Sequence, residues 1–180
     1  SVLEINPDAL AIAAELDEER RKGNIRGKLH GIPVLVKDNM ATKDRMQTTA
    51  GSWALLGSIV PRNAHVASQL REAGAVILGH AKMSEWASIR SSVYSSDYSP
   101  RRGQVRNPYD LFKRSWNKMY GERSKREFTV AKVDAYNNIN SYLAELQGTT
   151  MKTVEDIAAY VDTNSGTEGA REGDHAAFAS

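Results

Sequence analysis

The chain has 180 residues, of which 41% are hydrophobic and 26% are charged, and its formal net charge is +2. This composition is typical of one globular domain, and the small net charge argues against a polycation that binds nucleic acid through its overall field. Because the chain has no cysteine and no run of about 18 apolar residues, it excludes thiol catalysis, cysteine-ligated zinc and a membrane span.

The first predicted element is a helix over residues 7–22. Asn6 can cap its start, and Gly23 can end it in a left-handed conformation. Leu10 and Leu16 would lie on its apolar side. The charged residues near its end are expected to form a solvated face.

A short apolar strand is predicted over residues 33–36, and Lys37 follows directly. A lysine at the end of a buried strand can lose hydration, which favours its neutral form and lets it act as a base. The plainer interpretation is a lysine that marks the exit of the strand into water. The strand alone favours the plainer interpretation.

The middle of the chain predicts a helix, a strand and a second helix in that order. The helix covers residues 63–73, with Val66 on its apolar side, and the buried strand covers 75–78. A short helix capped by Ser84 follows. This order of elements indicates an α/β layered fold. His80 is expected just past the strand end, where α/β proteins place ligands, although a structural role is more common for a lone histidine.

Two further helices are predicted near the C-terminus. One covers residues 129–146, and its Asn138 and Asn140 suggest buried hydrogen bonds or contact with a partner segment. The other runs from a Thr153 cap through residue 162, with acidic residues in its first turn.

Three motifs follow one another along the chain. They are GIPVLVKDN at 31–39, TAGS at 49–52 and AGAVILGHAKMSEWA at 73–87. Together they resemble the amidase signature family, which includes fungal amidases and a component of glutamyl-tRNA amidotransferase. The resemblance implies part of a layered α/β fold, with a mixed sheet flanked by helices. It covers residues 1–114, stops at a basic junction over 115–126, and resumes in a helical segment with a flexible tail over 127–180.

The resemblance also implies an active site. The family hydrolyses carboxamides with a Ser–Ser–Lys triad, and Lys37 matches the lysine, which is the general base. The residues that match the active-site region are candidate binding residues: Asp38, Asn39, Thr49, Gly51 and Ser52. On its own chemistry Ser52 is a better helix cap than a catalytic group. We expect no cofactor and no metal, because the four histidines lack the spacing of zinc ligands.

The two serines of the triad have no match in this sequence. The family's Gly-Gly-Ser-Ser-Ser-Gly segment should follow residues 107–114, but residues 115–126 read SWNKMYGERSKR. The serine pairs at 91–92 and 95–96 lie upstream, outside any Gly-rich frame that could supply oxyanion donors. An acyl-enzyme route needs an activated hydroxyl. We therefore predict a shortened amidase-family protein that is catalytically inactive.

Two other functions remain open. One is a binding or regulatory protein that self-associates or pairs with another chain through uncovered apolar surface, with a small-molecule amide as ligand if activity remains. The weaker one is nucleic-acid binding through residues 100–126, where basic and aromatic residues alternate, although a junction between two family segments explains this stretch more simply. The first residues do not resemble a signal peptide, and nothing else indicates a compartment.

Overall fold

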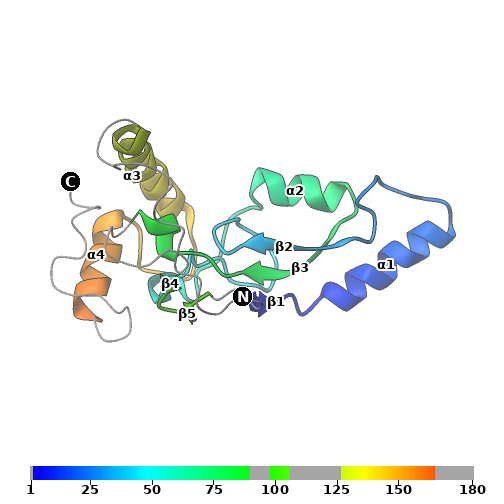
Figure 1. The fold of residues 1–180 in the computed structure, drawn as a ribbon, viewed down its shortest axis with the longest axis horizontal. Coiled ribbons are helices and arrows are strands. Elements are labelled where there is room, and N and C mark those ends of the chain that lie inside the picture. The colour runs from blue at the N-terminus through cyan, green and yellow to red at the C-terminus, as the bar shows by residue number, and fades with distance from the viewer. Residues whose placement is uncertain (1, 90–97, 106–126, 165–180) are drawn as a thin grey trace.

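The structure is a computed structural model, and it describes residues 2–89, 98–105 and 127–164 (Figure 1). Its centre is a sheet of β1 (Val2–Ile5), β2 (Pro33–Lys37) and β3 (Val76–Ala81). β3 lies in the middle, parallel to β2 and antiparallel to β1. The predicted mixed sheet flanked by helices is therefore confirmed.

The four α-helices follow the sequence predictions closely, whereas the β4–β5 hairpin was not predicted. The helices are α1 (Ala9–Arg21), α2 (His65–Glu72), α3 (Glu127–Glu145) and α4 (Val154–Thr163); η1 (Trp53–Leu55) and η2 (Glu85–Ser88) are 3-10 helices, and β4 (Tyr98–Ser99) and β5 (Gly103–Gln104) form a hairpin. Before α1, the Asn6 side chain accepts a hydrogen bond from the Asp8 backbone at 3.0 Å. Asn6 thus supports the turn before α1, but the predicted cap is shifted, because the N-cap residue is Asp8 and the helix begins at Ala9.

The two faces of the sheet pack on different helices. On one face, Val36 and Ile77 lie in a buried cluster with Met46 and with Ala67 of α2. On the other face, Val76 packs against Ala9 and Leu16 of α1. Figure 1 shows α2 along one side of the sheet, while α1 extends away from it.

A separate apolar cluster joins the C-terminal helices to the loop that follows β2. Leu143 of α3 and Ile157 of α4 are fully or almost fully buried there, together with Leu55 of η1 and Trp86 of η2. The helices over 127–164 therefore share a core with residues 50–60.

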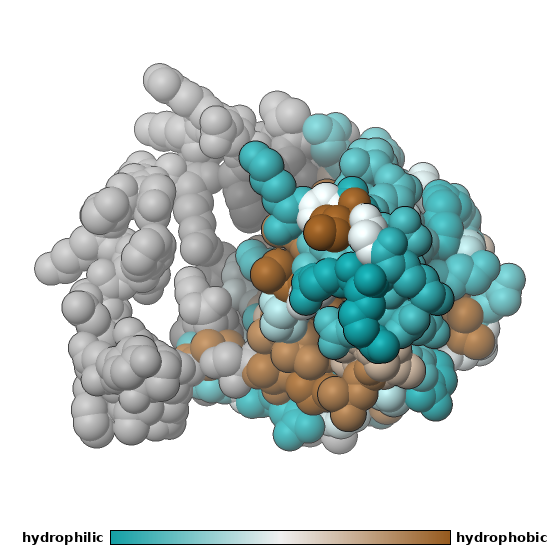
Figure 2. All heavy atoms as spheres, turned by 90° about the vertical axis from the view of Figure 1, so that its right-hand side faces the viewer, coloured by the Kyte–Doolittle hydropathy of each residue, from teal (hydrophilic) through white to brown (hydrophobic). Residues whose placement is uncertain are grey.

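The predicted burial of several apolar residues is wrong. β2 was expected to be a buried strand, but only Val36 is buried in it, and Leu35 is 43% exposed. Leu10 of α1 is 87% exposed, and Val66 of α2 is also exposed. Figure 2 shows apolar surface gathered on the lower half of one side of the molecule. These helices each bury only a narrow stripe, because each contacts one face of a small sheet.

Two details of the β3 region also differ from the sequence prediction. His80 lies inside β3 rather than past its end, since the strand continues to Ala81. η2 is a 3-10 helix in which Trp86 and Ala87 adopt φ of 47° and 55°. Ser84 occupies the N-cap position, as predicted, but its side chain makes no capping hydrogen bond.

Other predictions lie outside the described residues. These include the serine pairs at 91–92 and 95–96, the junction over 115–126 and the tail after 164. Within the described ranges, none of the helices has the length and hydrophobicity that crossing a bilayer requires. No group of three potential metal-binding side chains gathers in those ranges either.

Candidate active site

Lys37 is the last residue of β2, and it pairs with Ala81 of β3. Its side chain is exposed, and its ammonium group makes no hydrogen bond or ion pair with any described residue. The burial that the first interpretation of Lys37 requires is absent, and the exposed side chain agrees with the plainer one, a lysine that marks the exit of the strand into water. The reason is the position of β2, which has a neighbour on one side only among the described strands.

The sheet face that carries Lys37 can be identified from the strand register. Leu35 and Ile5 both pair with Gly79, so their side chains lie on one face. That face is opposite α2, because Val36 packs on α2 and side chains alternate along a strand. Lys37 lies two residues after Leu35 and shares its face. Leu35 is 43% and Ile5 is 55% exposed, so this face is open where Lys37 lies.

Asp38, the next residue, has the opposite environment and is fully buried. Its carboxylate accepts hydrogen bonds from the Thr49 backbone at 3.2 Å, the Thr49 hydroxyl at 2.6 Å and the Gly51 backbone at 2.9 Å. His80 Nδ1 lies 3.3 Å from the same carboxylate. A buried carboxylate is tolerated only when such donors surround it. Asp38 therefore ties the turn at 49–51 to the end of β2.

Gly51 is required in this turn for two reasons. Its φ is +79°, and a Cβ built on it would lie 2.9 Å from the Cβ of Ser99. A side chain would therefore be strained in conformation and would collide with the β4–β5 hairpin. The glycine of the TAGS motif thus lets the hairpin approach the loop.

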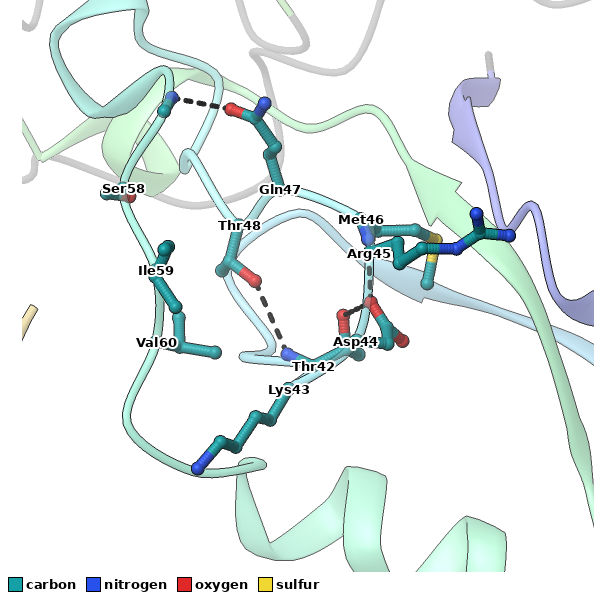
Figure 3. Close-up of a pocket in the computed structure, with 11 residues that line it drawn as sticks. Thr42, Lys43, Asp44, Arg45, Met46, Gln47, Thr48, Ser58, Ile59 and Val60 are labelled. Atoms are coloured by element: carbon teal, nitrogen blue, oxygen red, sulfur yellow. Dashed lines mark hydrogen bonds between the residues drawn. The ribbon is translucent and has the colours of Figure 1, made fainter. Parts of the chain in front are cut away.

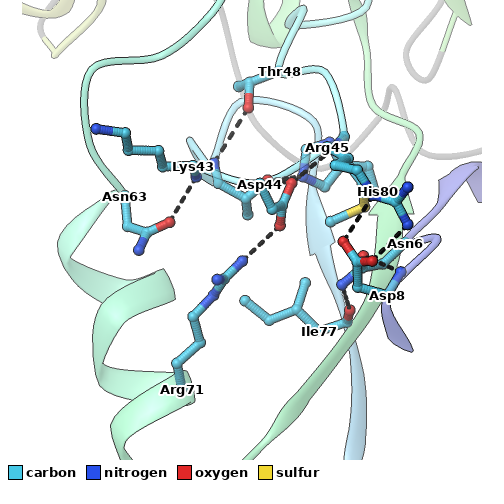
Figure 4. A network of polar contacts seen from close by, with 12 residues as sticks. Asn6, Asp8, Lys43, Asp44, Arg45, Thr48, Asn63, Arg71, Ile77 and His80 are labelled. Carbon is cyan, nitrogen blue, oxygen red and sulfur yellow. Dashed lines mark hydrogen bonds and ion pairs between the residues drawn. The ribbon is translucent and has the colours of Figure 1, made fainter. Parts of the chain in front are cut away.

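His80 extends the network away from Lys37. Its Nδ1 lies 3.0 Å from the Gln47 carbonyl, and its Nε2 lies 3.0 Å from the Thr42 hydroxyl. Thr42 also contacts Asp44, which forms an ion pair of 2.6 Å with Arg71 of α2 (Figure 4). The more common structural role considered for His80 agrees with these contacts, since it is fully buried among them.

The sequence did not connect two nearby residues with this network: Arg101 was considered only as part of the basic stretch 100–126, and Tyr142 was not singled out. Arg101 of the hairpin donates to the Thr49 hydroxyl at 2.8 Å. Tyr142 of α3 has no hydrogen-bond partner for its hydroxyl in the described part of the chain. Burial, followed by the negative charge of Asp38, raises the pKa of Tyr142 to about 12. Helical spacing alone could place Tyr142 on α3 but not near Asp38, which is distant in the sequence.

The five candidate binding residues divide by burial. Asn39 is exposed, whereas Asp38, Thr49, Gly51 and Ser52 are buried and hold the loop together. Ser52 accepts a hydrogen bond from the Ala54 backbone at 3.2 Å and caps η1, as predicted. A ligand can therefore reach Asn39 directly, whereas contact with the other four requires a rearrangement.

A cavity of about 150 Å³ lies beside this network, between residues 42–48 and 57–60 (Figure 3). Gln47 closes one end by accepting a hydrogen bond from the Gly57 backbone at 2.6 Å. The buried Ser58 hydroxyl in its wall has no partner in the described ranges. Lys37, the candidate base, is not among the residues that line this cavity.

Comparisons with known proteins give one consistent result. A family model described as Amidase matches residues 1–115. The Schizosaccharomyces pombe protein named "Putative amidase C869.01" is 66% identical over 110 residues, which are 61% of this chain and 19% of that protein. A relative from Natranaerobius thermophilus, named as a component of glutamyl-tRNA(Gln) amidotransferase, is 42% identical over 102 residues, which are 57% of this chain and 20% of that protein.

Solved structures agree with this match. The native peptide amidase from Stenotrophomonas maltophilia superposes with a TM-score of 0.58 and 52% sequence identity. The matched region covers 62% of this chain and 22% of the peptide amidase. The chain thus spans about a fifth of the length of the relatives that it matches.

Proposed function

Because this chain belongs to the amidase family, we propose that it supplies Lys37 as the general base of a unit that hydrolyses carboxamide C–N bonds. We also propose that the chain alone does not complete this unit. The first statement is supported by the family match, which includes Lys37. The observation that carries the second is the position of Lys37, exposed at the end of β2 with no hydroxyl partner among the described residues.

The chemistry requires more than a lysine. In the family's reaction, the base takes a proton through a bridging serine from a nucleophilic serine, whose oxygen attacks the amide carbon. The nucleophile must be free to give up its proton, and donors must stabilise the oxyanion that forms. The hydroxyl of Thr49 cannot take this part, because its only hydrogen is donated to Asp38. The Ser52 hydroxyl is buried and caps η1.

The state of the lysine supports the second statement. A lysine is a base only when it is neutral, and burial is the main factor that favours this form. Lys37 lies on an open sheet face, and its side chain is exposed. The unit therefore needs a cover over this face as well as the serines.

The inactivity is tested by measuring ammonia release from a peptide carboxamide. We expect no release above the buffer rate for the wild-type chain, for Lys37→Ala, or for Lys28→Ala as an exposed-lysine control. Hydrolysis that Lys37→Ala abolishes and Lys28→Ala retains would contradict the proposal.

The role of Lys37 is tested in a chimera in which residues 1–114 replace the matched segment of the Stenotrophomonas maltophilia peptide amidase. We expect the chimera to hydrolyse peptide carboxamides, since the two segments share 52% identity. Lys37→Ala should remove this activity, and Lys28→Ala should not. A folded chimera whose activity survives Lys37→Ala would show that Lys37 is not the base.

A second candidate function is binding to another polypeptide or to a second copy of the chain. The observation that favours it is the open sheet face around Leu35 and Ile5, since uncovered apolar surface promotes association. Light scattering over a range of concentrations tests it, and we expect association that Leu35→Asp weakens. A monomer at the highest concentration would rule it out. The weaker alternative, nucleic-acid binding through 100–126, depends mainly on residues outside the described ranges.

A further inference from the structure

We infer that Arg101 is a binding residue for the carboxylate group of a ligand, beside the Asp38–Thr49 network. If the ligand is the substrate, the inference rests on the proposed function, and it predicts that the substrates are amides that also carry a carboxylate group. As a statement about binding, it stands on the surroundings of Arg101 alone.

The guanidinium group of Arg101 is held in place from two sides. Arg101 lies in the turn between β4 and β5, which the Arg102 backbone closes with a hydrogen bond of 3.3 Å to the Ser99 carbonyl. Its Nη1 donates to the Thr49 hydroxyl at 2.8 Å, and its guanidinium carbon lies 5.6 Å from the centre of the Trp53 ring. An arginine over a tryptophan ring is favourably placed. The side chain is therefore ordered before any ligand arrives.

Arg101 nevertheless has no counter-ion among the described residues. Six other described arginines each form an ion pair with an aspartate or glutamate: Arg20, Arg21, Arg26, Arg45, Arg62 and Arg71. Arg101 is half-buried, whereas Arg102 beside it, which also has no ion pair in the described part of the chain, is exposed to water. A half-buried charge without a partner is costly, so its retention in a fixed position calls for an explanation.

Asp38 is near but does not neutralise Arg101 directly. The Thr49 hydroxyl lies between them, donating to Asp38 at 2.6 Å and accepting from Arg101 at 2.8 Å. The Asp38 carboxylate is already occupied by the backbone groups of Thr49 and Gly51 and by His80. Thr49 therefore orients Arg101 while most of the guanidinium donors stay unused.

Unused hydrogen-bonding groups mark the same place. Arg101 Nε and the hydroxyl of Ser99 are both buried without a partner in the described part of the chain. A buried polar group without a hydrogen-bond partner is unfavourable. Ser99 is fully buried and contacts Gly51 across the loop. The hairpin and the loop thus bring unsatisfied donors together beside the Asp38–Thr49 network.

The chemistry of these donors selects the ligand. A guanidinium group is planar and matches the two oxygens of a carboxylate, with which it forms charge-assisted hydrogen bonds. A carboxamide of the same shape lacks the negative charge and presents only one oxygen acceptor. The site is therefore expected to distinguish a carboxylate from its amide.

The test is a titration of the full chain with N-acetylglycine and, as the matched neutral probe, N-acetylglycinamide. Salt is adjusted to constant ionic strength. Binding is followed by tryptophan fluorescence, which reports on Trp53, and by the nitrogen NMR signal of the Arg101 side chain. We expect a saturable change with N-acetylglycine and about tenfold weaker binding of N-acetylglycinamide, from the loss of charge-assisted hydrogen bonds.

The variants are Arg101→Gln, Arg101→Lys and, as the matched control, Arg102→Gln. We expect Arg101→Gln to lose the response, Arg101→Lys to weaken it, and Arg102→Gln to leave it unchanged. The inference is overturned if the wild-type chain does not distinguish the two probes, if Arg101→Gln binds as the wild type does, or if Arg102→Gln loses as much. The comparison of probes on the wild-type chain decides the question even if a variant does not fold.

The outcome is separate from that of the proposed function. If the chimera is active and depends on Lys37, but the chain does not bind N-acetylglycine, only the role of Arg101 is disproved. Carboxylate binding by the chain, together with a folded chimera whose activity survives Lys37→Ala, would keep the Arg101 site and remove the catalytic role of Lys37.

Discussion

Lys37 and Asp38 are neighbours in the chain, but their side chains belong to two different regions. Asp38 is fully buried in a polar network, where backbone groups, a hydroxyl and His80 surround its carboxylate. Lys37 lies at the end of an open sheet face without a polar partner among the described residues. The Asp38 network fixes the backbone next to Lys37, but it supplies neither burial nor a hydrogen-bond partner for the Lys37 side chain.

The physical reason lies in the cost of burial. A buried carboxylate is tolerated only if nearby groups supply its hydrogen bonds. The Asp38 network must therefore be complete within one stretch of chain. An exposed lysine makes no such demand, since water solvates it.

The largest expected effect comes from breaking the network with Asp38→Ala. This change leaves the Thr49 and Gly51 backbone donors without their acceptor in a buried site. We expect the free energy of unfolding to fall by about 3–5 kcal/mol, as when one partner of a buried charged group is removed. Urea unfolding followed by circular dichroism measures the loss.

Asn39→Ala is the matched control, because Asn39 is the exposed residue on the other side of Asp38. Surface changes of this kind usually stay within about 0.5 kcal/mol. If Asp38→Ala were no more harmful than Asn39→Ala, the contrast between the buried network and the open face would not hold.

A smaller effect is expected at alkaline pH from Tyr142, which lies within reach of the Asp38 charge. Its pKa is raised from 10.0 to about 12, mainly by burial and secondly by Asp38. Between these values the unfolded tyrosine loses its proton while the folded one keeps it, so the unfolded state binds fewer protons. The contribution is fully present below about pH 10 and is lost as the pH rises through about 12, by roughly 2–3 kcal/mol.

The ultraviolet absorbance of tyrosinate measures this titration directly. We expect a late transition that disappears in Tyr142→Phe and remains in Tyr160→Phe, a control in α4. A Tyr142 that titrates together with the exposed tyrosines would mean that α3 does not cover the Asp38 region. The network would then be less enclosed than its hydrogen bonds indicate.

The elements of the fold were predictable because their signals are local. Asn6 and Gly23 bracket α1, and the apolar runs that became β2 and β3 stand out between polar turns. The family resemblance identified the residues after β2 as a unit. These features depend on residues that are neighbours in sequence, which is the range over which patterns carry information.

The site was predictable only in part, because its contacts join distant residues. Asp38 is 11 residues from Thr49 and 42 from His80, and no periodic pattern connects them. The exposure of Leu35 depends on the edge position of β2, which the composition of a strand does not reveal. Arg101 was hidden in a basic stretch, and only the positions of Thr49 and Trp53 distinguish it from Arg102.

The smallest expected effect comes from removing the cap at the start of α4, a helix that packs beside the loop at 50–60. Thr153 accepts a hydrogen bond from the Asp156 backbone at 3.1 Å, and Asp156 accepts one from the Thr153 backbone at 2.9 Å. These two bonds form a capping box at the predicted Thr153 cap, and α4 places Ile157 and Val161 in the cluster beside the loop at 50–60. Thr153→Ala should lower the free energy of unfolding by about 1 kcal/mol.

The matched control is Thr150→Ala, which removes an exposed threonine three residues before the cap. It should change stability by less than about 0.5 kcal/mol in the same urea experiment. Thr153→Ala should also leave the late tyrosine transition in place, because one lost cap does not detach a helix whose apolar face is buried. If that transition moved to lower pH, the burial of Tyr142 would depend on the capped start of α4. The buried region around Asp38 would then include α4 as well as the residues that bind the Asp38 carboxylate.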